Sequence, residues 1–128
     1  MSRQFLLIKQ LSPELSKAAY LHHLPEMIRV GYRMVGVFHS SKCIGISGFW
    51  IGTKLYSGKF IEPDNVVIDK KYRSKGIGKL LLHWLEQEGR KQKCKTIMLD
   101  AYLENISGHR FYYREGFVAR GFHFLKKL

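Results

Sequence analysis

Hydrophobic and polar positions along the chain follow two different periods, and the change between them marks the predicted elements. In residues 66–82, an apolar run that holds Val66 and Val67 precedes a polar, basic stretch with two glycines. A short apolar run with β-branched residues predicts a buried strand. After the glycines, apolar residues recur at the spacing of one helix face, at Ile77, Leu80, Leu81, Trp84 and Leu85. This stretch therefore predicts a strand, a glycine turn and a helix.

The same reading along the whole chain predicts nine elements, including this strand and helix. Strands are expected at residues 3–10, 32–38, 43–53, 60–69, 96–101 and 117–124, and helices at residues 12–24, 74–89 and 105–115. The resulting order is β-α-β-β-β-α-β-α-β. We predict an α/β fold with a mixed, largely antiparallel central sheet that is flanked by helices.

Serine, proline and glycine set the predicted boundaries. Ser12 and Pro13 are expected as N-cap and first residue of a helix, Pro25 is expected to interrupt that helix, and Gly89 is expected as a C-cap. Pro63 cannot donate a backbone hydrogen bond, so its end of the strand is expected to be irregular or at an edge.

Three glycines, Gly45, Gly48 and Gly52, interrupt the strand predicted at residues 43–53. Glycine weakens a strand, and its presence there indicates bulges or the close approach of a ligand.

Composition limits the class of protein. A chain of 128 residues with 45% hydrophobic and 25% charged residues is expected to form one domain, residues 1–128. It shows no apolar run of membrane length and no secretory signal. Cys43 and Cys94 are isolated and form no metal-binding spacing, which is typical of free thiols in a reducing compartment. We therefore expect a cytoplasmic protein that binds no metal.

The formal net charge is +12, and it is uneven. Residues 1–65 carry eight Lys and Arg against four Asp and Glu, whereas residues 66–128 carry fourteen against six. Such a field attracts a nucleotide-bearing cofactor, a nucleic acid or an acidic surface, and charge alone does not separate these partners.

The glycine turn before the second helix is a place to bind phosphate, because helix N-termini leave N–H groups unpaired and glycine lets an anion approach closely. The dinucleotide pattern G-x-G-x-x-G fails at Leu81, and the phosphate-loop pattern G-x-x-x-x-G-K-[ST] fails at Leu80. What remains is Arg73-x-x-Gly76-x-Gly78. This segment resembles the acyl-CoA pyrophosphate loop of the GNAT superfamily of N-acetyltransferases, whose pattern is Gln/Arg-x-x-Gly-x-Gly/Ala after a strand.

Residues 105–117, NISGHRFYYREGF, resemble the second signature of the same superfamily. In that signature an asparagine opens a helix, a small residue follows three positions on, and a Phe-Tyr pair precedes Gly-Phe. The matching positions are Asn105, Gly108, Phe111, Tyr112, Gly116 and Phe117. The small residue is usually alanine, so Gly108 is a mild departure. The resemblance covers nearly the whole chain and implies a single GNAT-like domain over residues 1–128.

The resemblance implies acetyl-CoA as acyl donor and assigns residues to it. Backbone groups of the strand would pair with the pantetheine arm, N–H groups of the turn would hold the pyrophosphate, and Asn105 would hydrogen-bond the pantetheine. The residues concerned are Val66, Val67, Ile68, Arg73, Ser74, Lys75, Gly76, Ile77, Gly78, Lys79 and Asn105. Lys75, Lys79 or Arg110 would meet the 3′-phosphate, with solvated surface charge as the equal alternative.

The resemblance also implies direct acetyl transfer to a primary amine, which must lose a proton before it attacks. Glu62 or Asp64 would take that proton; two positions apart on a strand, they point to the same face. We favour Glu62 because it reaches further. An N–H near Val67 would stabilise the oxyanion, and Tyr112 would protonate the leaving thiolate.

Other interpretations stay open. Glu62 and Asp64 can be surface acids, and Tyr112 a packed aromatic residue beside Phe111. The histidines at positions 22, 23 and 109 are better explained as helix-end, packing or surface residues than as ligands. The sequence does not identify the acceptor, which is a small molecule or a peptide. It also leaves open the length of the acyl group and whether the chain forms a homodimer. The alternative function is a catalytically silent scaffold that binds nucleic acid, although no nucleic-acid motif is present.

Overall fold

The computed structural model describes all 128 residues and divides them into two compact units, Met1–Met98 and Leu99–Leu128. The expectation of a single domain stays a prediction. The first unit holds the sheet and most helices, and the second holds one helix and the C-terminal segment. In chain order the elements are η1 (Ser2–Gln4), α1 (Phe5–Leu11), α2 (Lys17–Arg29), β1 (Arg33–His39), β2 (Lys42–Lys54), β3 (Gly58–Ile68), η2 (Lys70–Tyr72), α3 (Ile77–Lys91), β4 (Thr96–Ile97) and α4 (Ile106–Arg114).

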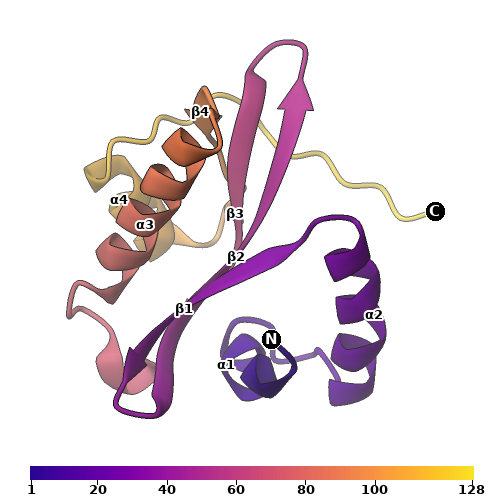
Figure 1. Ribbon diagram of the computed structural model, residues 1–128, viewed down its shortest axis with the longest axis vertical. Helices are drawn as coiled ribbons and strands as arrows, with labels where there is room; N and C mark the ends of the chain where they lie inside the picture. Colours follow the sequence, from indigo (N-terminus) through magenta and orange to yellow (C-terminus); the bar gives the residue numbers. More distant parts are fainter. The chain divides into compact units, whose positions relative to one another are not determined.

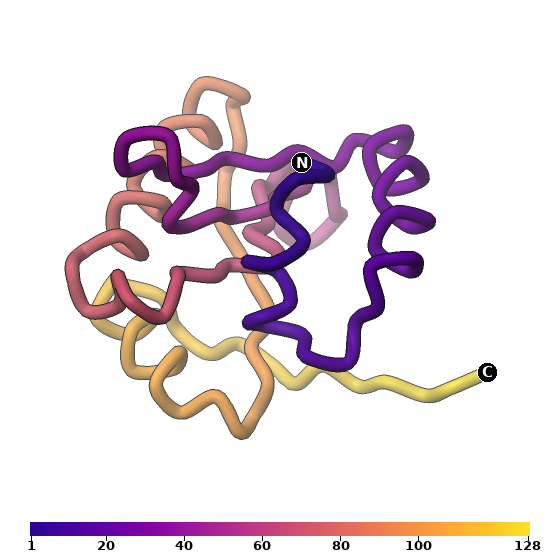
Figure 2. Tube along the Cα trace, turned by 90° about the horizontal axis from the view of Figure 1, so that it is seen from below, coloured from indigo at the N-terminus to yellow at the C-terminus, as the bar shows by residue number.

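The first unit is a four-stranded sheet between two layers of helix (Figure 1). Strands β1, β2 and β3 pair as an antiparallel meander, and β4 joins β3 in parallel. Helix α3 makes the connection between the two parallel strands on one face, while α1 and α2, joined by residues 12–16, lie on the other (Figures 1 and 2). The prediction of a mixed, largely antiparallel sheet flanked by helices is confirmed.

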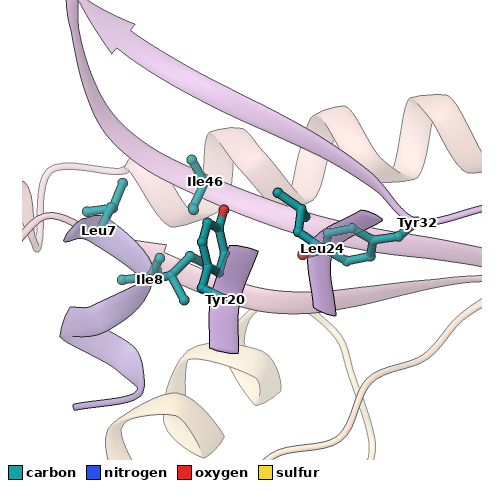
Figure 3. Close-up of a cluster of buried hydrophobic side chains, with 7 residues drawn as sticks. Leu7, Ile8, Tyr20, Leu24, Tyr32 and Ile46 are labelled. Carbon is teal, nitrogen blue, oxygen red and sulfur yellow. The ribbon is translucent and has the colours of Figure 1, made fainter. Parts of the chain in front are cut away.

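Both faces of the sheet are buried. Under α1 and α2, a cluster of apolar side chains joins the helices to β2 and β3 (Figure 3). Its members are Leu7, Ile8, Tyr20, Leu24, Tyr32, Ile46 and Val67. Under α3 the closest packing is at Leu81, Leu82 and Leu85, each at most 1% exposed. Each fully buried aliphatic side chain contributes about 1.5–3 kcal/mol, so these two layers fix the position of β3.

The strand predicted at residues 3–10 is wrong, because this segment is helical. Leu7 and Ile8 are buried and Leu6 is 77% exposed, so the apolar run presents a helix face and not an alternating strand. A short apolar run does not discriminate between the periodicity of a helix and that of a strand.

The predicted caps also need correction. Helix α2 begins at Lys17 with Ser16 as N-cap, whose Oγ accepts the Ala19 N–H at 3.0 Å, and not at Ser12. Pro25 lies inside this helix and does not end it. Leu24 beside it is 5% exposed in the core, so tertiary packing holds the helix through the proline.

Gly89 lies inside α3 and is buried, so its predicted role as a C-cap is wrong. A Cβ at this position would lie 2.9 Å from Ile61 Cγ2. Glycine is therefore placed here for close packing of the helix on β3.

Near the C-terminus the predictions are wrong in two places. The strand predicted at residues 96–101 is reduced to β4, Thr96–Ile97, and residues 117–124 form no strand. Helix α4 is confirmed, with Asn105 as its N-cap. A strand requires a partner for its backbone groups, and an alternating sequence does not supply one. None of the helices combines the length and apolar character that a membrane span requires.

Candidate active site

Strand β3 carries the two candidate carboxylates on one face of the sheet. Glu62 lies opposite Trp50 in the β2–β3 register, and Asp64 lies opposite Gly48. Residues two apart on a strand point to the same side, so the expected common face of Glu62 and Asp64 is confirmed. The indole Nε1 of Trp50 donates to Asp64 Oδ2 at 3.1 Å, which orients that carboxylate. Both carboxylates are half-buried.

A bulge follows directly after the carboxylates. Asn65 and Val66 of β3 oppose one residue of β2, Ser47, and Asn65 has a left-handed φ of 54°. Bulges re-aim side chains and are common beside active sites. The irregularity expected near Pro63 is therefore present two residues later, where asparagine tolerates the left-handed conformation.

Tyr32 lies next to this bulge and contacts Asn65. Asn65 Nδ2 donates to Tyr32 Oη at 3.4 Å, and the rings of Tyr32 and Trp50 are 5.0 Å apart. Burial of the phenol raises the pKa of Tyr32 to about 12, so Tyr32 is neutral at physiological pH. Tyr32 and Asn65 were not among the residues that the sequence predicted for the site. The available signal was an asparagine, a poor strand former, inside an apolar strand.

The glycines of β2 make room for side chains and not for a ligand. A Cβ at Gly48 would overlap the ring of Tyr32. A Cβ at Gly45 would lie 2.8 Å from Ile77 Cγ2, and one at Gly52 would lie 2.7 Å from the ring of Phe60. The bulges predicted from these glycines are present, since the strand register shifts beside Gly45 and beside Gly48.

Interactions of Asp69 fix the beginning of the turn between β3 and α3. Asp69 accepts the Lys71 N–H at 3.0 Å and pairs with Lys42 Nζ at 2.7 Å. Lys42 and then the Lys71 N–H hold the pKa of Asp69 below its usual value. Arg73 Nε donates to the Ile68 carbonyl at 3.3 Å, which folds the turn back on the strand.

Beyond Arg73 the turn exposes backbone N–H groups. Ser74 and Gly76 have φ values of 59° and 79°, and Gly76 is the N-cap of α3. No side chain caps this helix, and its first backbone bond is the Leu80 N–H to the Gly76 carbonyl at 3.0 Å. The N–H groups of residues 77–79 therefore face outward at the positive end of a 15-residue helix. A Cβ at Gly76 would meet nothing within 4 Å, so the space over the turn is open.

The turn is strongly basic. The ammonium groups of Lys42 and Lys75 lie 5.2 and 5.4 Å from the centre of the Tyr72 ring. Lys42 is also paired with Asp69, whereas Lys75 directly precedes Gly76 in the chain. A lysine next to an uncapped helix N-terminus is suited to a phosphate group.

The edge of β3 toward β4 is largely unpaired. Strand β4 pairs only at Phe60↔Thr96 and Ile61↔Ile97, and the Met98 N–H adds a bond to the Ile61 carbonyl at 3.1 Å. The β3–β4 ladder contains no pair beyond Ile61. Pro63, which lacks an N–H, fits at such an edge, as predicted. Val66 and Val67 therefore lie on a strand edge to which an extended molecule can add.

The second unit holds the other two predicted site residues. Asn105 Oδ1 accepts the Gly108 N–H at 3.0 Å and caps α4. A Cβ at Gly108 would overlap the Asn105 side chain, which explains glycine there. The Tyr112 ring lies 5.4 Å from Phe111 and 5.7 Å from Phe117, and burial raises the pKa of its phenol.

His109 has a structural partner. Its Nε2 donates to the Tyr102 carbonyl at 2.8 Å, in agreement with the packing role preferred from the sequence. No group of three His, Cys, Asp or Glu side chains is arranged to hold a metal ion.

The structure thus groups the predicted site residues in two sets. The carboxylates, the strand edge and the turn come together in Met1–Met98, and Asn105 and Tyr112 come together in Leu99–Leu128.

Curated proteins similar to this chain include two N-acetyltransferases. An aminoalkylphosphonate N-acetyltransferase of Salmonella typhimurium is 29% identical over 77% of this chain and 64% of its own length. A probable spermine N(1)-acetyltransferase of Bacillus subtilis subsp. natto is 32% identical over 70% of this chain and 62% of its own. The chain therefore spans less than two thirds of the length of these relatives.

Among solved structures, an acetyltransferase of Trypanosoma brucei superposes with a TM-score of 0.77 at 25% identity, covering 99% of this chain and 92% of that one. The family model described as "Acetyltransferase (GNAT) family" matches residues 5–117. The chain belongs to the GNAT family of acetyltransferases.

Proposed function

We propose that the chain is an acetyl-CoA-dependent N-acetyltransferase that moves an acetyl group to a primary amine by direct attack. The observation that supports this most is the uncapped N-terminus of α3 behind the left-handed turn at Gly76, next to the unpaired edge of β3. The first feature is suited to a diphosphate, and the second is suited to an extended pantetheine arm. Both lie in one unit and follow each other along the chain.

In this proposal the donor is held by backbone groups. Val66, Val67 and Ile68 run beside the pantetheine arm, although the Ile68 carbonyl already accepts from Arg73. The N–H groups of residues 74–79 hold the pyrophosphate, with Lys75 and Lys79 as nearby cations. Asn105 binds the pantetheine through its side-chain Nδ2 group, because its Oδ1 caps α4.

The acceptor amine is mostly protonated at neutral pH, with an unperturbed pKa of about 10, so a base must remove a proton before attack. Glu62 or Asp64 is the base. We favour Glu62, because its side chain reaches further and Asp64 is the shorter acid. An N–H near Val67 stabilises the oxyanion, as a preformed donor at the reacting carbonyl.

Tyr112 is the general acid toward the leaving thiolate. Burial raises the pKa of its phenol, so Tyr112 holds its proton at neutral pH, as an acid must. The alternative of a catalytically silent GNAT scaffold that binds nucleic acid is not favoured, because the curated relatives carry the names of N-acetyltransferases.

The test is release of free thiol from acetyl-CoA across a panel of amines and peptides, with mass spectrometry of the product. Glu62→Gln should lower kcat/KM by about 10²–10⁴-fold, the usual worth of a general base, while Asp64→Asn should cost less. Tyr112→Phe should lower kcat more than it raises KM, with Tyr113→Phe as the matched control. Absence of acetyl-CoA binding at millimolar concentration would contradict the proposal.

A further inference from the structure

A cavity of about 240 Å³ lies between α1, α2 and the sheet. Aliphatic side chains from the helices and their connection line one part of it, among them Leu15, Leu24 and Met27. His23, Tyr32 and Asn65 bring polar atoms to the rest. No Asp, Glu, Lys or Arg is among the lining residues.

This cavity lies beside the carboxylates of β3. Asn65, in its wall, follows Asp64 directly in the bulge. Tyr32, also in its wall, lies 5.0 Å from the ring of Trp50, which donates to Asp64. A molecule whose amine is at Glu62 or Asp64 can therefore place its remainder in the cavity.

The lining determines what that remainder can be. A second ammonium group there would lose hydration without a carboxylate to pair with, which is costly. The polar lining residues His23, Tyr32 and Asn65 include no carboxylate that could pair with this ammonium group. An aromatic or aliphatic group, in contrast, loses no charge-based hydration and contacts Leu15, Leu24 and Met27.

The volume is suited to a ring with a short arm. An apolar cavity of about 150 Å³ is known to accept a benzene molecule. At about 240 Å³, the cavity accommodates such a ring and leaves room for about two further carbon atoms.

We propose, on the basis of the acetyltransferase function proposed above, that this cavity holds the uncharged body of the acceptor and selects arylalkyl monoamines over polyamines. The cavity is thus a specificity site, and the acceptor class differs from the polyamine in the name of the Bacillus relative. Glu62 or Asp64 meets the reacting amine, and the cavity meets the part of the acceptor that does not react.

The experiment compares 2-phenylethylamine, spermine and ethylamine as acceptors. The wild type should prefer 2-phenylethylamine over spermine by at least about tenfold in kcat/KM. Asn65→Asp adds a carboxylate to the wall, and aspartate tolerates the left-handed φ of 54° at this position. It should shift that ratio toward spermine by about tenfold.

A second pair of variants tests the volume. Met27→Trp fills the cavity and should raise the KM for 2-phenylethylamine far more than that for ethylamine. Leu21→Trp makes the same change on α2 at a residue that is 44% exposed and does not line the cavity, and it should change neither KM.

Binding without turnover separates this inference from the proposed function. Saturation-transfer NMR should detect 2-phenylethylamine on the wild type and on Leu21→Trp, but not on Met27→Trp, whether or not acetyl-CoA is present. If amines are acetylated with spermine preferred, or if Asn65→Asp and Met27→Trp leave the selectivity unchanged, the cavity assignment is wrong and the enzyme assignment stands. If 2-phenylethylamine does not bind at millimolar concentration, the assignment is likewise overturned.

Discussion

Replacement of Gly76 by alanine separates two roles of this residue in the turn before α3: it adopts a left-handed backbone conformation, and it leaves space for the proposed donor. Gly76 has a φ of 79°, and a Cβ there would meet no protein atom within 4 Å. Alanine is therefore strained only through its backbone, at a cost of about 1–2 kcal/mol in the free energy of unfolding. The proposed pyrophosphate, however, lies over this turn, so the new methyl group would contact the donor.

The matched control is Gly31→Ala. Gly31 also has a left-handed φ, 106°, and open space at its Cβ, but it lies between α2 and β1 and away from the turn. Both variants should therefore lose similar stability in the absence of donor. Only Gly76→Ala should bind the donor more weakly, by about tenfold or more.

Urea unfolding with and without acetyl-CoA measures both effects. At 100 times its dissociation constant, a ligand adds about 2.7 kcal/mol to the free energy of unfolding. A tenfold loss of affinity reduces this increment to about 1.4 kcal/mol at the same donor concentration. The wild type and Gly31→Ala should show the full increment, and Gly76→Ala the reduced one. Equal increments in all three proteins would refute the role of the turn.

Three further predictions concern stability. Gly48→Ala forces a methyl group into the Tyr32 ring and should lower the free energy of unfolding by about 1–3 kcal/mol, whereas Gly121→Ala, with open space, should change it little. Burial raises the pKa of the Tyr32 phenol to about 12 from an ordinary value of 10.0. Its contribution to the free energy of unfolding is therefore complete below pH 10 and is lost as the pH rises toward 12. The loss amounts to about 2.7 kcal/mol. Tyr32→Phe should remove this part of the decline in urea titrations between pH 9 and 12, and an unchanged slope would contradict the burial argument. Gly89→Ala should destabilise by a similar 1–3 kcal/mol, because its Cβ would lie 2.9 Å from Ile61 Cγ2; a stabilised variant would restore the view that helix propensity dominates there.

The sequence predicted the central part of the fold well. The hairpin of β1 and β2, strand β3, the glycine turn and α3 combine long periodic patterns with turn residues, and these local signals agree with one another. The errors are at the ends of the chain and at isolated Pro and Gly residues. Pro25 and Gly89 both carry strong local signals for a helix end, but packing against the sheet overrides them.

The candidate site shows the same division. Arg73, Gly76 and Gly78 were visible as a motif, because an anion-binding turn needs fixed residue types at short, fixed spacing. The Trp50–Asp64 hydrogen bond and the Tyr32–Asn65 contact join residues 14 and 33 positions apart. No periodicity reports such contacts, since they depend on strand register and on one bulge.

By itself, the sequence determined the order of the central elements, the basic character of the chain and the glycine turn before α3, because each depends on neighbouring residues. Only the tertiary structure decided that residues 3–10 are helical, that the β3–β4 ladder ends at Ile61, and that a cavity without charged side chains lies beside the carboxylates. The physical reason is that these features arise where separate segments bury one another's surfaces, and the free energy of that burial exceeds local preference.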